Sequence, residues 1–262
     1  MDPLISRKYT QLQHFLLEKK KVAVAFSGGV DSSLVLYAAV QILGSNNVLA
    51  LHAALALHGP DDFSEVQKIA GHIGCRLLVL PINPLDWPEF VENPVNRCYI
   101  CKKKIFGTFR DHLGNGDIVH LVDGTNADDL QQFRPGLKAL EELGVASPLA
   151  DAGLGKKEIR TLSREVSLPT WNKPSASCLA TRIDPGHRIT PEKLAMVAAI
   201  EQFLAARGYA GSRARLSFDR LLVELQQADN VRFFDSGDRQ ALLDFVEKWE
   251  IKKVYLDILG RE

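Results

Sequence analysis

A short run of glycine and serine offers the clearest chemistry in this sequence. Residues 27–33 read SGGVDSS and follow the apolar segment Val22–Phe26. Two adjacent glycines allow a tight turn whose backbone N–H groups face one point, at a helix N-terminus that favours an anion. Asp31 could hold Mg²⁺ or orient a serine hydroxyl, and the lysine of a Walker A loop is missing. We expect these residues to cradle phosphate and metal: Ser27, Gly28, Gly29, Asp31 and Ser32.

The cysteines form the second chemical signal. Cys98 and Cys101 are spaced CxxC at the predicted start of a helix, followed by three lysines. This spacing can direct two thiols at one metal or cluster, or form a redox pair, and the helix dipole favours thiolate. Cys178 lies in a loop with little packing reason to hold a thiol and is the third candidate ligand. Cys75 begins a strand and is interpreted as a small core residue.

Polar residues after a later apolar segment complete the candidate phosphate site. Asp123, Asn126 and Asp129 follow the segment Ile118–Val122, and carboxylates there could hold Mg²⁺ through water. Arg134, before a Pro-Gly turn, could pair bidentately with phosphate or carboxylate. A solvated loop around Asp129 and a surface role for Arg134 are the alternatives.

The elements that position these residues alternate between strand and helix. Strand-like segments alternating with helical ones predict a parallel sheet covered on both faces, which binds ligands outside the carboxyl ends of its strands. After Val22–Phe26, the predicted strands are Val48–Ala54, Leu77–Pro81, Ile118–Val122 and a weaker Ala146–Leu149. The predicted helices cover residues 5–19, 32–43, 61–73, 99–112 and 155–166.

The composition changes around residue 170, which divides the chain into two expected domains. Residues 1–170 form the α/β domain, and residues 171–262 form a crossover loop and a small α+β domain. In the second domain we predict helices at about 190–206 and 237–249, with strands near 212–218, 221–226 and 253–258.

The whole-chain properties exclude several classes of protein. The 262 residues carry a formal net charge of zero, which argues against a nucleic-acid partner bound through a diffuse field. No apolar run reaches transmembrane length, and residues 1–21 are too charged for a secretory signal. We therefore expect no membrane partner and a cytoplasmic location, where four cysteines favour metal or catalytic chemistry over disulfides.

Taken in order, the motifs resemble a known family. The loop at 27–33 resembles the SGGxDS pyrophosphate loop of the PP-loop ATP pyrophosphatases. With RCYICK at 97–102, DGTNADD at 123–129, RPGLKA at 134–139, WNKP at 171–174 and CLATR at 178–182, it resembles LarE, the ATP-dependent sulfur transferase family of nickel-pincer nucleotide biosynthesis.

The resemblance implies a reaction and its cofactors. ATP with Mg²⁺ would adenylate a carboxylate of pyridinium-3,5-biscarboxylic acid mononucleotide, and a sulfur nucleophile would then displace AMP. One branch of the family sacrifices a cysteine sulfur, here from Cys178. The other carries sulfide on a 4Fe–4S cluster held by three cysteines, and Cys98, Cys101 and Cys178 resemble that branch.

The resemblance also implies roles in the second domain. Arg182 would meet a substrate carboxylate or the adenylated intermediate, and Glu201 would orient this arginine. Arg213 and Arg215 alternate on a predicted strand and so share one face, where they would bind substrate phosphate at a subunit interface. The implied assembly is a homo-oligomer, such as a hexamer, and the sulfide donor stays unidentified.

Other functions stay open at this level. A tRNA thiolation enzyme would combine the same loop with cysteines, but it calls for a zinc ribbon or a basic RNA-binding domain that is not recognisable here. An amidating synthetase would need an ammonia source and leaves the cysteines unexplained. A non-catalytic nucleotide or iron–sulfur sensor would bind ATP without releasing pyrophosphate, which the intact loop with Asp31 disfavours.

Overall fold

The computed structural model divides the chain into two compact units. It describes residues 2–55, 60–114, 116–118, 120–132, 134–174 and 177–261. The first unit comprises residues 1–83 and 96–176, and the second comprises residues 84–95 and 177–262. Within the described residues, no helix is both long enough and apolar enough to span a membrane.

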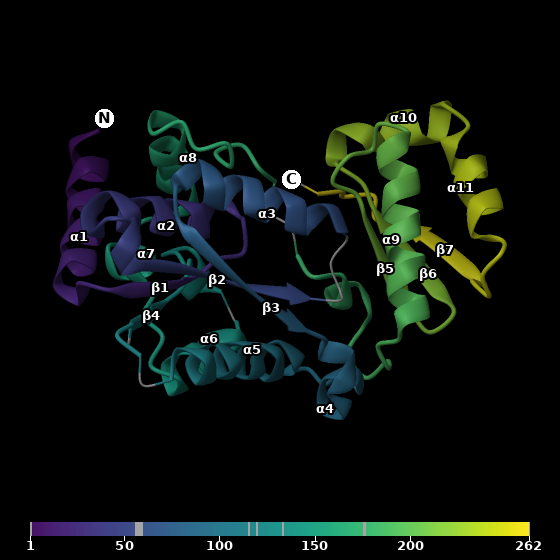
Figure 1. The fold of residues 1–262 in the computed structure, drawn as a ribbon. Helices are drawn as coiled ribbons and strands as arrows, with labels where there is room; N and C mark the ends of the chain where they lie inside the picture. Colours follow the sequence, from purple (N-terminus) through teal and green to yellow (C-terminus); the bar gives the residue numbers. More distant parts are fainter. Residues whose placement is uncertain are drawn as a thin grey trace. The chain divides into compact units, whose positions relative to one another are not determined.

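A parallel sheet of four strands forms the centre of the first unit (Figure 1). Its order is β3-β2-β1-β4, so the strand that leads into the glycine loop is internal. Alternate residues of β1 face opposite layers of core, with Val22 and Val24 in one and Ala23 in the other. The strands are β1 (Val22–Ala25), β2 (Val48–Leu55), β3 (Arg76–Ile82) and β4 (His120–Val122).

Helices cover both faces of this sheet, which confirms the predicted α/β class. The core on one face contains residues of α1 (Pro3–Lys19), α2 (Val30–Leu43), α3 (Pro60–Ile73), α7 (Pro148–Asp151) and α8 (Lys156–Glu165). Helices α5 (Arg97–Leu113) and α6 (Gly136–Glu142) contribute to the core on the other face (Figure 1). The described residues of this unit also form 3-10 turns at Ser45–Asn47 and Asp129–Gln131.

The weak fifth strand predicted at Ala146–Leu149 was wrong. Only a single parallel bridge forms there, between Ala146 and Val122. Pro148 is the first residue of α7, and its ring favours the first turn of a helix while removing a donor from a strand ladder. The bridge still places this segment beside β4, and the Asp123 amide donates to the Ala146 carbonyl at 2.9 Å.

The second unit is a small α+β structure, as predicted. Strands β5 (Arg213–Ser217) and β6 (Arg220–Glu224) are antiparallel, and β6 pairs in parallel with β7 (Lys253–Leu256). One core joins this sheet to its helices, through residues such as Val197, Leu221 and Leu242. The helices are α4 (Pro88–Val91), α9 (Pro191–Ala206), α10 (Asn230–Asp235) and α11 (Asp238–Val246), with 3-10 turns at Pro84–Asp86, Leu179–Arg182 and Gln227–Asp229.

Residues 84–95 belong to the second unit although they precede α5 in the chain. The fully buried Asn93 explains this, because its amide donates to the carbonyls of Ile183, Asp184 and His187 at 3.2, 2.8 and 2.9 Å. The Gly186 amide in turn donates to the Asn93 carbonyl at 2.8 Å. The predicted division at residue 170 does not assign residues 84–95 to the second unit.

Candidate functional site

The glycine loop lies directly after β1 and has the conformation that its sequence predicts. Gly28 has a φ of +73°, a backbone conformation that favours glycine. A Cβ built there would also lie 2.8 Å from the Val66 side chain, so a larger residue would clash. The hydroxyls of Ser27 and Ser32 lie 3.0 Å apart, and the Ser27 amide donates to the Ser32 hydroxyl at 3.2 Å. These bonds fix a compact turn at the carboxyl end of the strand.

The start of α2 presents backbone donors at this turn. Gly29 is the N-cap residue, and no side chain caps the helix in the part of the chain that is described. The loop after β4 approaches closely, because a Cβ on Gly124 would lie 2.8 Å from the Ser32 amide nitrogen. A helix of 14 residues whose first N–H groups lack side-chain partners favours an anion such as phosphate.

Asp31 on the first turn of α2 fits the expected metal ligand. Its Oδ2 accepts a hydrogen bond from the Lys156 ammonium, whereas its buried Oδ1 has no hydrogen-bond partner among the residues that the structure describes. Burial raises the pKa of this carboxyl above its ordinary value, and the Lys156 charge opposes that shift. An unpartnered buried carboxylate oxygen is a group that a Mg²⁺ ion would satisfy.

The residues after β4 are brought to the same end of the sheet. Asp123 accepts from the Thr125 hydroxyl at 2.5 Å and from the Ser147 hydroxyl at 2.8 Å, so its carboxylate also braces the loop. The Asn126 side chain accepts the amide of Asp129 at 3.1 Å, and the Asp129 carboxylate accepts the Asn126 amide at 3.2 Å. Asn126 is therefore a loop-fixing residue, whereas Asp123 and Asp129 line a cavity.

A cavity of about 330 Å³ joins the glycine loop to these residues. Arg134 lines it and pairs with Asp129 at 2.8 Å between Nη2 and Oδ1, while its side chain stays about half exposed. Much of the remaining lining is apolar, which suits a base next to a phosphate cradle. The apolar lining comprises Ala25, Phe26, Leu51, Ala53, Leu55, Ile105, Phe106, Phe109 and Leu137.

Three lysines at this site were not singled out from the sequence. Lys102 lines the cavity with its Nζ 3.9 Å from Asp123 Oδ2, and Lys156 pairs with Asp31. Lys173 donates to the Gly28 carbonyl at 3.2 Å and to Glu65 at 2.6 Å, so it clamps the glycine loop. Lys102 and Lys173 lie within motifs that were noted as RCYICK and WNKP, which is the signal that could have identified them.

His52, for which no function is expected from the sequence, also lines the cavity. It is buried, and its Nδ1 lies 2.8 Å from the Phe26 carbonyl at the entrance to the glycine loop. His52 lies on β2, the strand beside β1, and its ring contacts the backbone where the glycine loop begins.

Within the second unit, Arg182 and Glu201 form a buried ion pair. Arg182 is only 6% exposed, and its Nε donates to Glu201 Oε1 at 2.6 Å. Its Nη1 donates to the hydroxyls of Ser177 at 2.6 Å and Thr181 at 3.0 Å. Glu201 also accepts the Ala214 amide at 3.1 Å, so the carboxylate fixes both the arginine and strand β5.

Arg213 and Arg215 lie on the same side of β5, as their spacing predicts. Arg215 pairs with Glu224 and donates to the Thr181 carbonyl at 3.2 Å. Arg213 has a buried Nε for which the described part of the chain supplies no hydrogen-bond acceptor. Burial and the neighbouring charges of Arg261 and Arg182 lower the pKa of Arg213. Clustered guanidinium groups with an unsatisfied donor suit an anion.

The three candidate cysteine ligands are distributed over both units. Cys98 is exposed and Cys101 is partly exposed on the first turns of α5, whereas Cys178 belongs to the second unit and precedes the turn Leu179–Arg182. No group of three or more histidine, cysteine or acidic side chains within the described residues is arranged to hold a metal ion. Cys75 is buried as expected, and burial raises the pKa of its thiol.

Comparisons with known proteins agree with the geometry of the first unit. The NAD synthase family model matches residues 6–91. A Lactiplantibacillus plantarum protein named pyridinium-3,5-bisthiocarboxylic acid mononucleotide synthase is 32% identical over 92% of this chain and 88% of its own length. Uncharacterized proteins of Synechocystis sp. and Methanocaldococcus jannaschii are 33% and 30% identical, over 98% and 96% of this chain and 96% of each relative. The chain belongs to the LarE family of ATP-using sulfur transferases, within the PP-loop superfamily.

Proposed function

We propose that this protein adenylates a carboxylate of pyridinium-3,5-biscarboxylic acid mononucleotide with ATP and replaces the AMP by sulfur, giving a thiocarboxylate. The observation that carries the proposal is the turn between β1 and α2, where uncapped backbone donors and the unpartnered Asp31 Oδ1 share one cavity. The name of the Lactiplantibacillus relative supports the choice of substrate.

The first step needs pyrophosphate to leave while a carboxylate oxygen attacks the α-phosphorus. The N–H groups at the start of α2 and the Ser27 and Ser32 hydroxyls would hold the departing pyrophosphate. Asp31 would hold Mg²⁺, which neutralises charge on the phosphate oxygens when it is bound. Lys102 and Arg134 line the same cavity and would add positive charge toward the phosphates.

The arginines of the second unit would hold the acceptor nucleotide. Glu201, Ser177 and Thr181 accept four of the five guanidinium N–H groups of Arg182. The fifth, on Nη2, is thereby preorganised for a substrate carboxylate or the acyl adenylate. Arg213 and Arg215 would bind the substrate phosphate, and the unpartnered Arg213 Nε supports this assignment. In a homo-oligomer, these residues would lie near a subunit interface.

The sulfur step is proposed to use Cys98, Cys101 and Cys178 as ligands of a 4Fe–4S cluster. The donor types fit, because the two cysteines of CxxC lie within the first turns of α5, where one turn of helix can direct two sulfur ligands at one cluster. Three cysteines would leave the fourth position of the cluster without a protein ligand, and a cluster bound in this way would supply a labile sulfide as the nucleophile.

A second sulfur source follows from the surroundings of Cys178. Its carbonyl accepts the Thr181 hydroxyl at 2.7 Å, and Thr181 in turn accepts from Arg182. These contacts tie the backbone of Cys178 to the proposed acyl-binding arginine and support a route in which its thiol would donate its own sulfur, after which Cys178 would remain as dehydroalanine. This alternative changes the source of sulfur and leaves the adenylation unchanged.

The test is the acceptor dependence of pyrophosphate release. With ATP, Mg²⁺ and sulfide, we expect pyrophosphate and AMP to form only when the biscarboxylate nucleotide is present, and mass spectrometry to show sulfur in place of oxygen in the product. Nicotinic acid adenine dinucleotide with ammonia serves as the matched alternative acceptor. Pyrophosphate release with that pair, and none with the biscarboxylate, would identify an amidating enzyme and overturn the proposal.

A further inference from the structure

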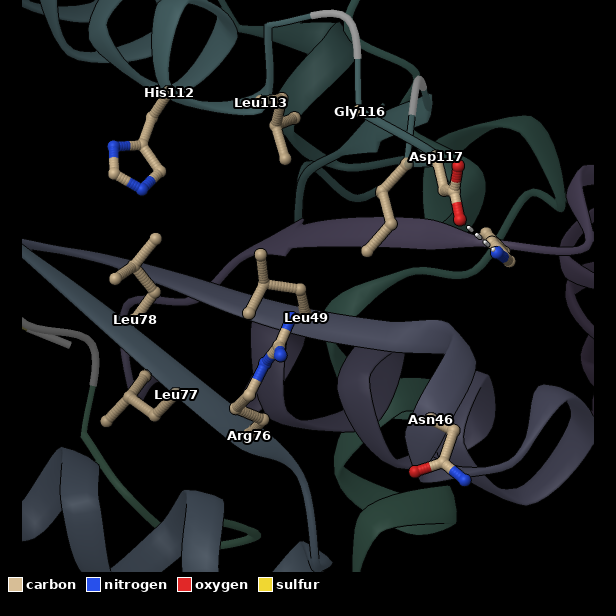
Figure 2. Close-up of a pocket in the computed structure, with 11 residues that line it drawn as sticks. Asn46, Leu49, Arg76, Leu77, Leu78, His112, Leu113, Gly116 and Asp117 are labelled. Atoms are coloured by element: carbon tan, nitrogen blue, oxygen red, sulfur yellow. Dashed lines mark hydrogen bonds and ion pairs between the residues drawn. The ribbon is translucent and has the colours of Figure 1, made fainter.

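A second and larger cavity, of about 600 Å³, lies at the amino ends of the strands in the first unit (Figure 2). Lys21 directly precedes β1, Arg76 is the first residue of β3, and Ile118 lies before β4. The glycine loop and Asp123 follow the carboxyl ends of β1 and β4. This cavity is therefore at the opposite end of the sheet and shares no lining residue with the nucleotide cavity.

The floor of this cavity is apolar. Figure 2 shows the side chains of Leu49, Leu78 and Leu113 gathered between Arg76 and His112. Leu77 and Ile118 extend the apolar lining. A volume of about 600 Å³ is in the range of small-molecule sites, and an apolar floor favours a ligand with a hydrocarbon or aromatic body.

The rim of the cavity carries an excess of positive charge. Lys21 donates to Asp117 Oδ2 at 3.0 Å, so this lysine is already neutralised by a described carboxylate (Figure 2). No carboxylate in the part of the chain that the structure describes pairs with the Arg76 guanidinium. His112 also lies on this cavity, in the last turn of α5. Arg76 therefore offers an uncompensated bidentate donor above an apolar floor.

We propose that this cavity is a second ligand site, for a small amphipathic anion whose carboxylate, sulfonate or phosphate pairs with Arg76 while its apolar body covers Leu49 and Leu78. The Lys21–Asp117 pair sets a limit to the affinity, because Asp117 repels the same anion that Arg76 attracts. The site is independent of ATP, since none of its residues belongs to the phosphate cradle.

The probe for this site is anilinonaphthalene sulfonate, which combines an anionic group with an aromatic body and fluoresces when it leaves water. Titrated into the full-length protein without ATP, it should bind, and Arg76→Gln should weaken that binding by about tenfold or more. Asp117→Asn should strengthen the binding, because it frees Lys21 and removes the repelling carboxylate. Octanoate and octyl phosphate, added separately as competitors, share one apolar body and so distinguish a carboxylate ligand from a phosphate ligand.

Two controls keep this test decisive. Arg7→Gln removes an exposed arginine from α1 and should leave the titration unchanged. Thermal melting of each variant shows that the fold is retained, and the opposite effects of Arg76→Gln and Asp117→Asn cannot both arise from damage to the fold. Equal binding by the wild type, Arg76→Gln and Asp117→Asn, or no binding by the wild type, would overturn the proposed site.

Discussion

Lys156, at the start of α8, donates its ammonium hydrogen to Asp31, at the start of α2, so two helix N-termini are joined by one ion pair at the glycine loop. The Asp128 carboxylate accepts the Lys156 amide at 2.8 Å and thereby fixes the start of α8. The pair neutralises one oxygen of a carboxylate whose other oxygen has no partner among the described residues. It opposes the rise in the Asp31 pKa that burial causes, and it holds the carboxylate in one orientation.

Replacing Asp31 tests whether this carboxylate serves a metal ion. Asp31→Asn keeps the shape of the side chain and removes its charge, so we expect Mg²⁺-dependent pyrophosphate release to fall by about a hundredfold, in the range for loss of a charge-stabilising group. Glu18→Gln is the control, because it alters an exposed carboxylate of α1 that lies outside the cavity lining. Isothermal titration of ATP with and without Mg²⁺ checks whether the loss comes from metal binding. If ATP binding by Asp31→Asn depends on Mg²⁺ as much as wild-type binding does, Asp31 is not the metal ligand.

The Lys173 clamp predicts a binding defect. Lys173→Met removes the bonds to the Gly28 carbonyl and to Glu65, which frees the glycine loop. We expect the Kd for ATP to rise by about tenfold, as for loss of a charged hydrogen bond. Lys157→Met, which removes an exposed lysine of α8, should leave the Kd unchanged. Equal Kd values for the two variants would show that the clamp does not support the loop.

The close approach of Gly124 to α2 predicts a steric effect. Gly124→Ala places a Cβ 2.8 Å from the Ser32 amide nitrogen and 3.0 Å from its Cα, so the β4 loop or the start of α2 must shift. We expect a lower Tm and lost ATP binding. Gly71→Ala in α3 meets no atom within 4 Å and should raise stability by about 0.5–1 kcal/mol through helix propensity. Differential scanning calorimetry compares the two, and an unchanged Tm for Gly124→Ala would refute the contact.

The Arg182–Glu201 pair predicts a difference between two substitutions at one position. Glu201→Ala leaves a buried guanidinium without its carboxylate and should cost about 3–5 kcal/mol of stability. Glu201→Gln retains an acceptor and should cost less, while both variants lower the rate of thiocarboxylate formation. Urea denaturation measures the stability. If Glu201→Ala unfolds at the wild-type urea concentration, the pair does not hold Arg182 in place.

The cluster proposal predicts which cysteines hold iron. Anaerobic reconstitution with iron and sulfide should give about four irons per chain and a broad visible absorption band. Cys98→Ala, Cys101→Ala and Cys178→Ala should each lose it, whereas Cys75→Ala should retain it because that thiol is buried in the core. Iron bound equally by all four variants, or by none of them and not by the wild type, would exclude the three-cysteine cluster.

The sequence pattern predicts the layers of this fold better than its site. Alternation within β1 and the helical segments between strands determine which face each residue covers, so the parallel sheet and the glycine loop at its carboxyl end were predictable. The Asp31–Lys156 pair was not, because its partners are 125 residues apart and only the tertiary fold joins them. The hydrogen bonds of Asn93, which connect residues 84–95 to the second unit, also join residues far apart in the sequence and were not predictable from it.

Short elements were the other weakness of the sequence prediction. Helices α6 and α7 contain 7 and 4 residues, too few for a hydrophobic period to stand out. The candidate residues Ser27, Asp31, Asp123, Asp129 and Arg134 do share one cavity, because each follows or faces the carboxyl end of a parallel strand. Predicting Arg213 and Arg215 as site residues required both their alternate spacing on β5 and the family resemblance.

The most direct measurement is the number of thiocarboxylate groups formed per protein chain in an anaerobic reaction with ATP, Mg²⁺, the biscarboxylate nucleotide and excess sulfide. We predict more than one sulfur transferred per chain, with the mass of the Cys178 peptide unchanged after the reaction. At most one sulfur per chain, with Cys178 converted to dehydroalanine, would contradict the cluster as sulfur carrier. No thiocarboxylate at all, with pyrophosphate release unaffected by the nucleotide, would contradict the proposed reaction itself.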